Sequence, residues 1–322
     1  MTTLETKKMP YVRLGNSGLK VSKIILGCMT YGSSGWQEWV LDEEEAIRHI
    51  KFAYEHGIQT FDTADMYSNG LSEVILGKAI KQLNLPREEI VVMTKLFMPF
   101  TPGKWGTNIF SSGQSADEIG LVNQHGLSRK HIFDAVKASL ERLQLDYVPV
   151  TMNLVDFSSH PPSPVHAMQN YAIRNKLTPF VAMQNHYSLM YREEEREMFP
   201  TLKMFGVGSI PFSPLGRGVL ARPLTENSKR GETDPFQKIY KGVGTPEIVK
   251  RVEEVAKKKG ISMAQVAIAW CLAKDGVSAP IVGTTSLDNL KDIIGGVHVT
   301  LGEDEIKYLE EPYIPQNIVG HA

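Results

Sequence analysis

The sequence has little cysteine, little net charge and no long apolar run, and each lack excludes a class of function. Its 322 residues include two cysteines, Cys28 and Cys271, which cannot form the disulfide framework of a secreted protein. A formal net charge of -1 gives no electrostatic reason to expect nucleic acid or an anionic membrane as partner. Apolar runs such as residues 264–273 are shorter than the roughly 20 residues that span a bilayer. We expect a cytoplasmic protein that acts on a small molecule.

Short apolar runs of the β type alternate with helical patterns along most of the chain. This alternation is typical of parallel βαβ units, and the length suits one large domain, residues 1–322. We expect seven strands, at residues 24–27, 58–62, 90–95, 147–152, 180–184, 207–211 and 281–282. A hairpin is expected at residues 11–22, a long loop at 96–127, and helices at 42–56 and at 72–83 with Ser72 as the N-cap.

A closed barrel of eight parallel strands needs one more unit than the sequence supplies. Residues 155–177 contain only one helical pattern, at 164–175, and Pro149 weakens the strand expected before it. About 30 residues, one strand and its helix, are missing from the expected pattern. The fold class we predict is therefore α/β, a TIM-type (β/α)8 barrel about one βα unit short around residues 148–165.

Two neighbouring predicted strands carry polar side chains at their carboxyl ends. Asp62 ends one strand, Tyr67 follows it by five residues, and Lys95 ends the next strand. The carboxyl ends of barrel strands form one rim, where barrel enzymes have their active sites. A phenol has a pKa of about 10, which an adjacent ammonium lowers by favouring the phenolate. We expect these three residues to form a proton donor for a carbonyl oxygen.

Several spaced motifs resemble the aldo-keto reductase family. They are Phe61-Asp62-Thr63-Ala64 with Tyr67, Lys95, Met183-Gln184-Asn185-His186-Tyr187 and Pro211-Phe212-Ser213-Pro214-Leu215. Residues 14–22 and 65–73 are similar to fungal members of the aryl-alcohol dehydrogenase type. The resemblance covers residues 10–147 and 158–319. It implies an enzyme that reduces aldehyde or ketone groups with NADPH, with Tyr67 protonating the oxygen and Lys95 and Asp62 assisting.

The resemblance also implies a nicotinamide cofactor, an aryl or polyketide-like carbonyl substrate of secondary metabolism, and no metal. The residues implied for cofactor binding are Ser158, Ser159, Gln184, Phe212, Ser213, Leu215, Arg217, Gly283, Thr285 and Asn289. NADP is the expected form. NAD stays open, because the basic residue that the family often places at the 2′-phosphate is here Gly283 or Asn289.

The family has a histidine at the end of its fourth strand, which orients the carbonyl, and this chain lacks one there. Residues 148–154 read Val-Pro-Val-Thr-Met-Asn-Leu instead. His160 is the nearest replacement, although a loop between prolines holds a side chain loosely. His186 lies past a strand end, where a hydrogen-bonded structural role is the stronger interpretation.

Other interpretations stay open at this point. Alone, Asp62 could cap backbone donors, Lys95 could be a solvated strand end and Tyr67 a surface aromatic. Trp36, Trp39 and Trp105 could line a substrate pocket or cover the barrel mouth. The missing unit and histidine also fit an impaired or inactive cofactor-binding relic, an interaction module, or an incorrect gene reading between residues 146 and 165. Substrate, reaction direction and oligomeric state are not predicted.

Overall fold

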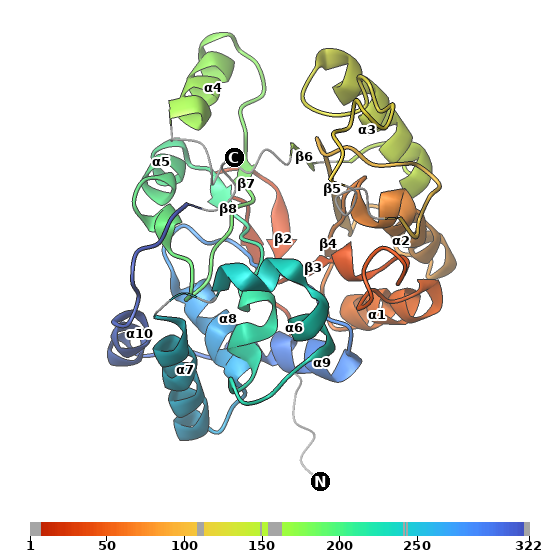
Figure 1. Ribbon diagram of the computed structural model, residues 1–322. Helices are drawn as coiled ribbons and strands as arrows, with labels where there is room; N and C mark the ends of the chain where they lie inside the picture. The colour runs from red at the N-terminus through yellow and green to blue at the C-terminus, as the bar shows by residue number, and fades with distance from the viewer. Residues whose placement is uncertain are drawn as a thin grey trace.

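The protein is an α/β molecule in which short parallel strands lie inside a layer of helices (Figure 1). The computed structural model describes residues 8–107, 113–148, 150–153, 163–240, 242 and 244–318. The inner strands are β3 (Ile25–Gly27), β4 (Thr60–Asp62), β5 (Val91–Leu96), β6 (Val150–Asn153), β7 (Ala182–Met183), β8 (Gly208–Ser209) and β9 (Ile281–Val282). All seven predicted strands are thus confirmed, most of them shorter than predicted.

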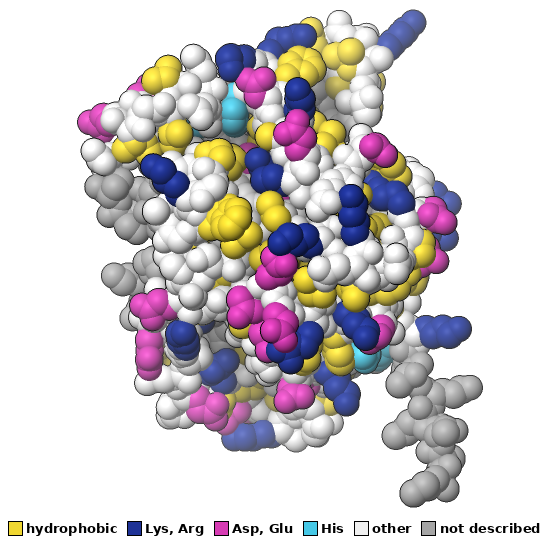
Figure 2. All heavy atoms as spheres, turned by 90° about the vertical axis from the view of Figure 1, so that its right-hand side faces the viewer, with side chains coloured by type: hydrophobic (Ala, Val, Ile, Leu, Met, Phe, Trp, Pro, Cys, Tyr) yellow, Lys and Arg dark blue, Asp and Glu magenta, His cyan; other side chains and the backbone are white. Residues whose placement is uncertain are grey.

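Ten α-helices occur within the described residues. They are α1 (Glu43–Glu55), α2 (Leu71–Gln82), α3 (Arg129–Leu143), α4 (Ser163–Arg174), α5 (Met198–Phe205), α6 (Lys229–Thr233), α7 (Thr245–Lys259), α8 (Met263–Ala273), α9 (Leu287–Gly295) and α10 (Glu303–Glu310). No helix in these ranges is long and apolar enough to cross a membrane. On the face formed by α1 to α3, acidic and basic side chains are interspersed, as the near-zero net charge leads one to expect (Figure 2).

The predicted hairpin closes the amino ends of the inner strands. It consists of β1 (Tyr11–Arg13) and β2 (Lys20–Ser22), which pair antiparallel with Val12 opposite Val21. The backbone N–H of Ser22 donates to Oγ1 of Thr60, the first residue of β4, at 3.2 Å. Apolar side chains of the hairpin join those of the strands in one buried cluster. The end opposite to the carboxyl rim is therefore covered.

The inner strands form an arc with one interruption. Five of them pair in parallel in the order β6-β5-β4-β3-β9, and β7 pairs with β8. The N–H of Ile281 donates to the carbonyl of Pro211 at 2.8 Å, which connects β9 to the segment after β8. No pairing joins β6 to β7 in the part of the chain that the structure describes. Residues 154–162, where the missing unit was predicted, are outside that part, and α3 and α4 flank the interruption (Figure 1).

The local signals for two helices near the site gave different results. Helix α1 lies where a helix was predicted at residues 42–56, and Asp42 caps it by accepting a hydrogen bond from the N–H of Glu45 at 3.1 Å. The prediction that Ser72 caps α2 is wrong, because the helix begins at Leu71 after Gly70. The Ser72 hydroxyl donates to the carbonyl of Cys28 at 2.8 Å instead. The loop after β5 has neither helix nor strand in its described residues, as predicted.

Candidate active site

The three predicted catalytic side chains meet at the carboxyl ends of β4 and β5. Nζ of Lys95 lies 2.6 Å from Oδ2 of Asp62 and 3.1 Å from the hydroxyl of Tyr67. It also donates to the carbonyl of Thr63 at 2.7 Å. Lys95 and Asp62 are 1% and 2% exposed. The parallel register of β4 and β5 produces this meeting, since both strands end at the same rim.

Charge keeps the lysine ionised in this cluster, and burial keeps the tyrosine protonated. Burial alone would lower the pKa of the Lys95 ammonium, but the facing Asp62 carboxylate and Tyr67 raise it above its ordinary value. Burial raises the pKa of Tyr67, and Lys95 lowers it only in part. The expectation that Lys95 gives the phenol a lowered pKa is therefore wrong in its net result, because desolvation of a phenolate outweighs the ammonium. At neutral pH the phenol carries a proton that it can donate.

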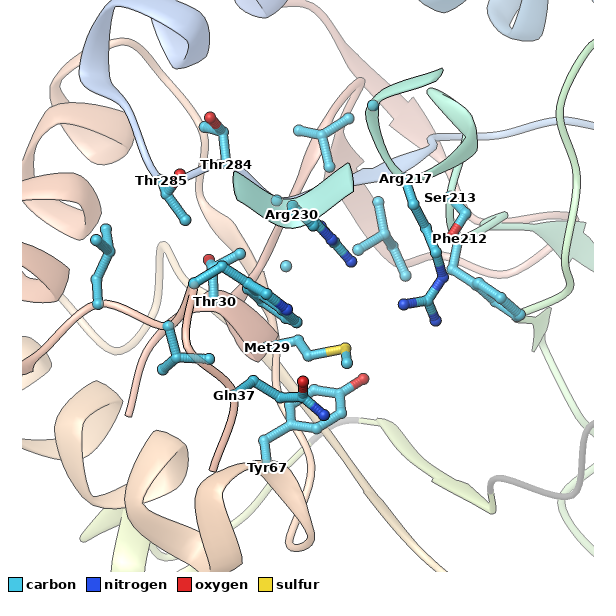
Figure 3. Close-up of a pocket in the computed structure, with 18 of the residues that line it drawn as sticks. Met29, Thr30, Gln37, Tyr67, Phe212, Ser213, Arg217, Arg230, Thr284 and Thr285 are labelled. Atoms are coloured by element: carbon cyan, nitrogen blue, oxygen red, sulfur yellow. The ribbon is translucent and has the colours of Figure 1, made fainter. Parts of the chain in front are cut away.

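A cavity of about 1740 Å³ opens beside this cluster. Asp62 and Tyr67 line it, together with Gln184, whose Nε2 donates to Oδ1 of Asp62 at 2.9 Å. Phe212 lines it as well, and Figure 3 shows Tyr67 and Phe212 on separate segments among the residues around this space. The phenol, its ion pair and the two predicted nicotinamide contacts therefore share one pocket.

The structure brings together every predicted cofactor residue that it describes. Those that line the cavity are Gln184, Phe212, Ser213, Leu215, Arg217, Gly283, Thr285 and Asn289. Ser158 and Ser159, and also His160, lie outside the described residues. Among the described residues no group of three or more histidine, cysteine or acidic side chains could hold a metal ion.

The segment after β8 turns tightly at the cavity wall. Ser213, Gly216, Arg217 and Gly218 all have positive φ, of 56°, 54°, 54° and 96°. The N–H groups of Gly216 and Gly218 donate within the segment, to the carbonyls of Ser213 at 2.8 Å and of Leu215 at 3.0 Å. A Cβ at Gly283, after β9, would lie 3.2 Å from the carbonyl of Gly27 in β3, so the absence of a side chain there lets the two strand ends approach closely.

Two arginines share one buried carboxylate at the same cavity. Asp234 is 5% exposed, and its Oδ2 lies 2.7 Å from Arg217 and 3.0 Å from Arg230. Arg230 also stacks over the ring of Trp39, 4.3 Å from its centroid, from the opposite wall. Sequence reasoning missed Arg230 and Asp234, because residues 228–234 read Ser-Lys-Arg-Gly-Glu-Thr-Asp, a mixed charge pattern that is typical of a solvated surface. The shared carboxylate leaves a net positive charge for an anionic ligand.

His186 supports the aromatic wall of the cavity. Its ring stacks between Tyr191 and Phe212, with centroids 4.3 and 5.1 Å away. Nε2 shares a hydrogen bond of 2.6 Å with the hydroxyl of Tyr240. Burial, aided by the charge of Arg217, lowers the pKa of His186 to about 3, so the ring is neutral at pH 7. His186 is thus hydrogen-bonded and buried, as the structural interpretation requires.

Aromatic and sulfur-containing side chains line the end of the cavity near Tyr67. Trp36, Trp39 and Trp105, together with Phe97 and Met98, belong to this lining. The Trp36 and Tyr67 rings lie 6.3 Å apart between centroids. All three tryptophans that were predicted at the rim therefore face the pocket, where they favour an apolar ligand.

One polar side chain attaches the loop that carries Trp105. Nδ2 of Asn69 donates to the carbonyls of Lys104 and Thr107, both at 2.7 Å, and its Oδ1 accepts from the N–H of Thr101 at 3.2 Å. Asn69 lies two residues after Tyr67, so the phenol and this pocket wall are positioned together.

The sequence model described as "Aldo/keto reductase family" matches residues 23–160 and 153–314. The chain belongs to the aldo-keto reductase family. Members are oxidoreductases that act on small carbonyl compounds with a nicotinamide cofactor, NADP by family, and their fold is the (β/α)8 barrel. The resemblance inferred from the separate motifs is confirmed, and so is the fold class.

Fungal relatives match nearly the whole chain. Versiconal hemiacetal acetate reductase of Aspergillus parasiticus is 44% identical over 341 residues, covering 96% of this chain and 98% of its own length. A Schizosaccharomyces pombe protein whose name places it among the aryl-alcohol dehydrogenases is 43% identical, with coverages of 96% and 97%. Aldo-keto reductase AFTS1 of Alternaria alternata is 40% identical, with coverages of 99% and 96%.

The same comparisons indicate an interruption in this aldo-keto reductase. The two pieces of the family match overlap at residues 153–160, inside the region where a βα unit was predicted to be missing. The alignment with the Aspergillus relative spans 341 positions, about 30 more than the 96% of this chain that it covers. The alignment therefore contains about 30 positions that this chain lacks, in total about the length of one βα unit.

Proposed function

We propose that this aldo-keto reductase reduces the aldehyde or ketone group of an aryl or polyketide-like substrate with NADPH, and that Tyr67 is the general acid. The observation that carries the proposal is the contact of Lys95 with Asp62 and Tyr67 at the edge of a large cavity. The tryptophan-lined end of that cavity supports an aromatic substrate. A cytosolic role in secondary metabolism is also proposed, from the two free buried thiols and the likeness to versiconal hemiacetal acetate reductase.

The residues present fit a nicotinamide dinucleotide. Bound there, the reduced cofactor supplies the hydride that the carbonyl carbon accepts. Phe212 offers a ring face, Gln184 an amide, and Arg217 a guanidinium for the pyrophosphate. Asn289 and Thr285 line the adenosine end in this proposal.

We propose NADP in preference to NAD because of basic side chains outside the positions that the family often uses. Arg222, Lys229 and Arg230 line the same cavity. Nε of Arg222 is buried and has no hydrogen-bond partner among the described residues, so it is a donor that a phosphate would satisfy. An affinity for NADH equal to that for NADPH would contradict this part of the proposal.

The proton step follows from the contacts of Tyr67. As the carbonyl carbon accepts hydride, its oxygen gains charge and takes the proton from the Tyr67 hydroxyl. The resulting phenolate faces the Lys95 ammonium, whose Nζ lies 3.1 Å from the Tyr67 hydroxyl oxygen. Asp62, held by Gln184 and Lys95, keeps that ammonium charged and in place. The ion pair thereby stabilises the state that forms when the proton has left.

Tyr67→Phe tests the proposal directly. NADPH oxidation with an aryl aldehyde should fall by about a hundredfold or more, since a general acid contributes about 10²–10⁴ in rate. NADPH binding, followed by tryptophan fluorescence, should change less than twofold. Tyr171→Phe is the control, because Tyr171 is 64% exposed on α4. A wild-type protein that consumes no NADPH across a broad panel of carbonyl compounds would overturn the proposal.

A second candidate is a cofactor-binding protein without turnover. The missing histidine favours it, since residues 148–154, where the resemblance places the end of the family's fourth strand, contain none. NADPH should then stabilise the protein against heat while no carbonyl compound accelerates NADPH oxidation. Replacement of His160 separates the candidates further: His160→Ala should reduce turnover if this residue substitutes for the family histidine.

A further inference from the structure

A buried ion pair joins the two segments that carry the catalytic groups. Glu73, in the first turn of α2, is 0% exposed and lies six residues after Tyr67. Its Oε2 accepts from Nε of Arg142, in the last turn of α3, at 2.6 Å. Its Oε1 accepts a hydrogen bond from the hydroxyl of Thr94, the residue before Lys95. One carboxylate therefore contacts both β5 and α3 from the start of α2.

The alternation of side chains along β5 explains why this pair lies behind the active site. Lys95 points to Asp62 inside the arc of strands, so Thr94 points outward to α2. The segment between is fixed as well, because the N–H of Asp65 donates to the carbonyl of Lys95 at 3.1 Å. A shift of Glu73 would therefore act on Lys95 through Thr94 and on Tyr67 through its own chain.

Arg142 reaches this carboxylate only because the neighbouring turn has no side chain. A Cβ at Gly70 would lie 2.9 Å from Cδ of Arg142, and Gly70 has φ of +94°. The guanidinium carbon of Arg142 also lies 5.3 Å from the centroid of the Phe100 ring, on the loop after β5. Arg142 thus packs against the turn after Tyr67 and against the loop that forms one pocket wall.

A third acidic group in this region depends on the same arginine. Asp65 is 1% exposed, and its Oδ2 has no hydrogen-bond partner among the described residues. Burial and the charge of Glu73 raise the pKa of Asp65 well above its ordinary value, whereas Arg142 and Lys95 lower it. Without Arg142, the carboxyl groups of Asp65 and Glu73 would share a buried space whose remaining positive charge is Lys95. That ammonium is already paired with Asp62.

We infer that Glu73 and Arg142 are positioning residues for the catalytic pair: they hold Thr94 and the turn after Tyr67 so that the Lys95 ammonium stays within hydrogen-bond distance of the Tyr67 hydroxyl. This inference rests on the proposed reductase function. Among the described residues the pair contacts neither the cavity nor the cofactor segments, so its loss should affect the rate of the chemical step and leave cofactor affinity unchanged.

The test compares Arg142→Met, Arg142→Lys and Thr94→Val with Arg129→Met as the control. Arg129 lies on the same helix, with its guanidinium 5.8 Å from the centroid of Phe133. For Arg142→Met we expect kcat to fall about a hundredfold, the loss that a displacement of about 1 Å produces. The dissociation constant of NADPH should stay within twofold, and the primary isotope effect with deuterated NADPH should increase.

The conservative variants separate positioning from folding. Arg142→Lys keeps the charge and should recover at least a tenth of the wild-type kcat, Thr94→Val should lose about tenfold, and Arg129→Met should lose nothing. All rates are taken at least 10 °C below each variant's Tm, with circular dichroism matching the wild type. An unchanged kcat in folded Arg142→Met, or a loss that appears only as weaker NADPH binding, overturns the inference.

A second readout does not need turnover. Tyrosinate absorbance, measured as the difference from Tyr67→Phe, gives the pH at which Tyr67 ionises. Arg142→Met should move that midpoint, because the distance between Tyr67 and Lys95 and the exposure of both change, whereas Arg129→Met should not. If the wild type is inactive but Arg142→Met shifts the midpoint of Tyr67 ionisation, the proposed function is refuted and the positioning role is supported. If Arg142→Met leaves the midpoint unchanged, the positioning role is refuted.

Discussion

Removal of the Lys95 ammonium should cost far more stability than removal of an exposed lysine. The Lys95 and Asp62 side chains are 1% and 4% exposed and 2.6 Å apart. Methionine at position 95 keeps the apolar stem but leaves the carboxylate buried without its cation. Loss of one partner of a buried pair costs about 3–5 kcal/mol, because the remaining charge is uncompensated. We expect a decrease of this size in the free energy of unfolding.

Urea denaturation of Lys95→Met, Asp62→Asn, their double variant and Lys130→Met measures this cost and isolates its cause. Lys130→Met is the control, because Lys130 and Asp134 are also 2.7 Å apart but 66% and 63% exposed, which predicts a change below about 0.5 kcal/mol. The double variant, which carries Asp62→Asn as well as Lys95→Met, should be more stable than Lys95→Met alone by at least about 2 kcal/mol, since it has no uncompensated buried carboxylate.

Two results would refute this reasoning. One is a cost below about 1 kcal/mol for Lys95→Met, which would mean that water reaches Asp62. The other is a double variant whose destabilisation equals the sum of the two single ones, since the residues would then not interact. Neither result depends on catalysis, so the ion pair is tested even in an inactive protein.

Three further predictions concern turnover and ligands. Burial raises the pKa of Tyr67, so the protonated form that donates to the substrate persists above the ordinary phenol pKa of about 10. The kcat for reduction should therefore stay level from pH 7 to about pH 10 and fall only at higher pH. A midpoint near neutral pH in the pH profile of kcat would contradict this. Asn69→Asp removes the amide that donates to the carbonyls of Lys104 and Thr107. The KM of an aryl aldehyde should then rise about tenfold at unchanged NADPH affinity, and limited proteolysis near Trp105 should become faster. An unchanged KM and an unchanged proteolysis rate would show that other contacts hold the loop. Arg230→Met should weaken NADPH binding about tenfold in a fluorescence titration, because about one charge-assisted contact is lost, and should weaken NADH binding less. An equal loss of affinity for both cofactors would assign Arg230 to the pyrophosphate.

Local chemistry made parts of this fold predictable. The cap at Asp42 and the apolar core of β4 act within a few residues, so α1 and the strand before Asp62 could be predicted from sequence. Ser72 shows the limit, because its hydroxyl serves Cys28, 44 residues away, in place of the helix end. No local pattern contains that partner.

The site shows the same division. Asp62, Tyr67 and Lys95 follow from strand ends that share one rim, a rule that needs only the order of strands. Lys95 lowers the pKa of Tyr67 as predicted, but burial by residues distant in sequence raises it more, and the strand ends alone do not contain that burial. The contact of Arg217 with Asp234 spans 17 positions that include loop residues and the short helix α6, so spacing along the chain carries no information about their distance.

The ammonium of Lys95 has three N–H bonds, and the structure gives each one an acceptor: Asp62, the carbonyl of Thr63 and Tyr67. Its hydrogen-bonding capacity is therefore exhausted before any ligand arrives. A substrate oxygen can sense this cation only through the intervening phenol. Amine-selective reagents that label the solvent-facing lysines of the folded protein should leave this nitrogen untouched.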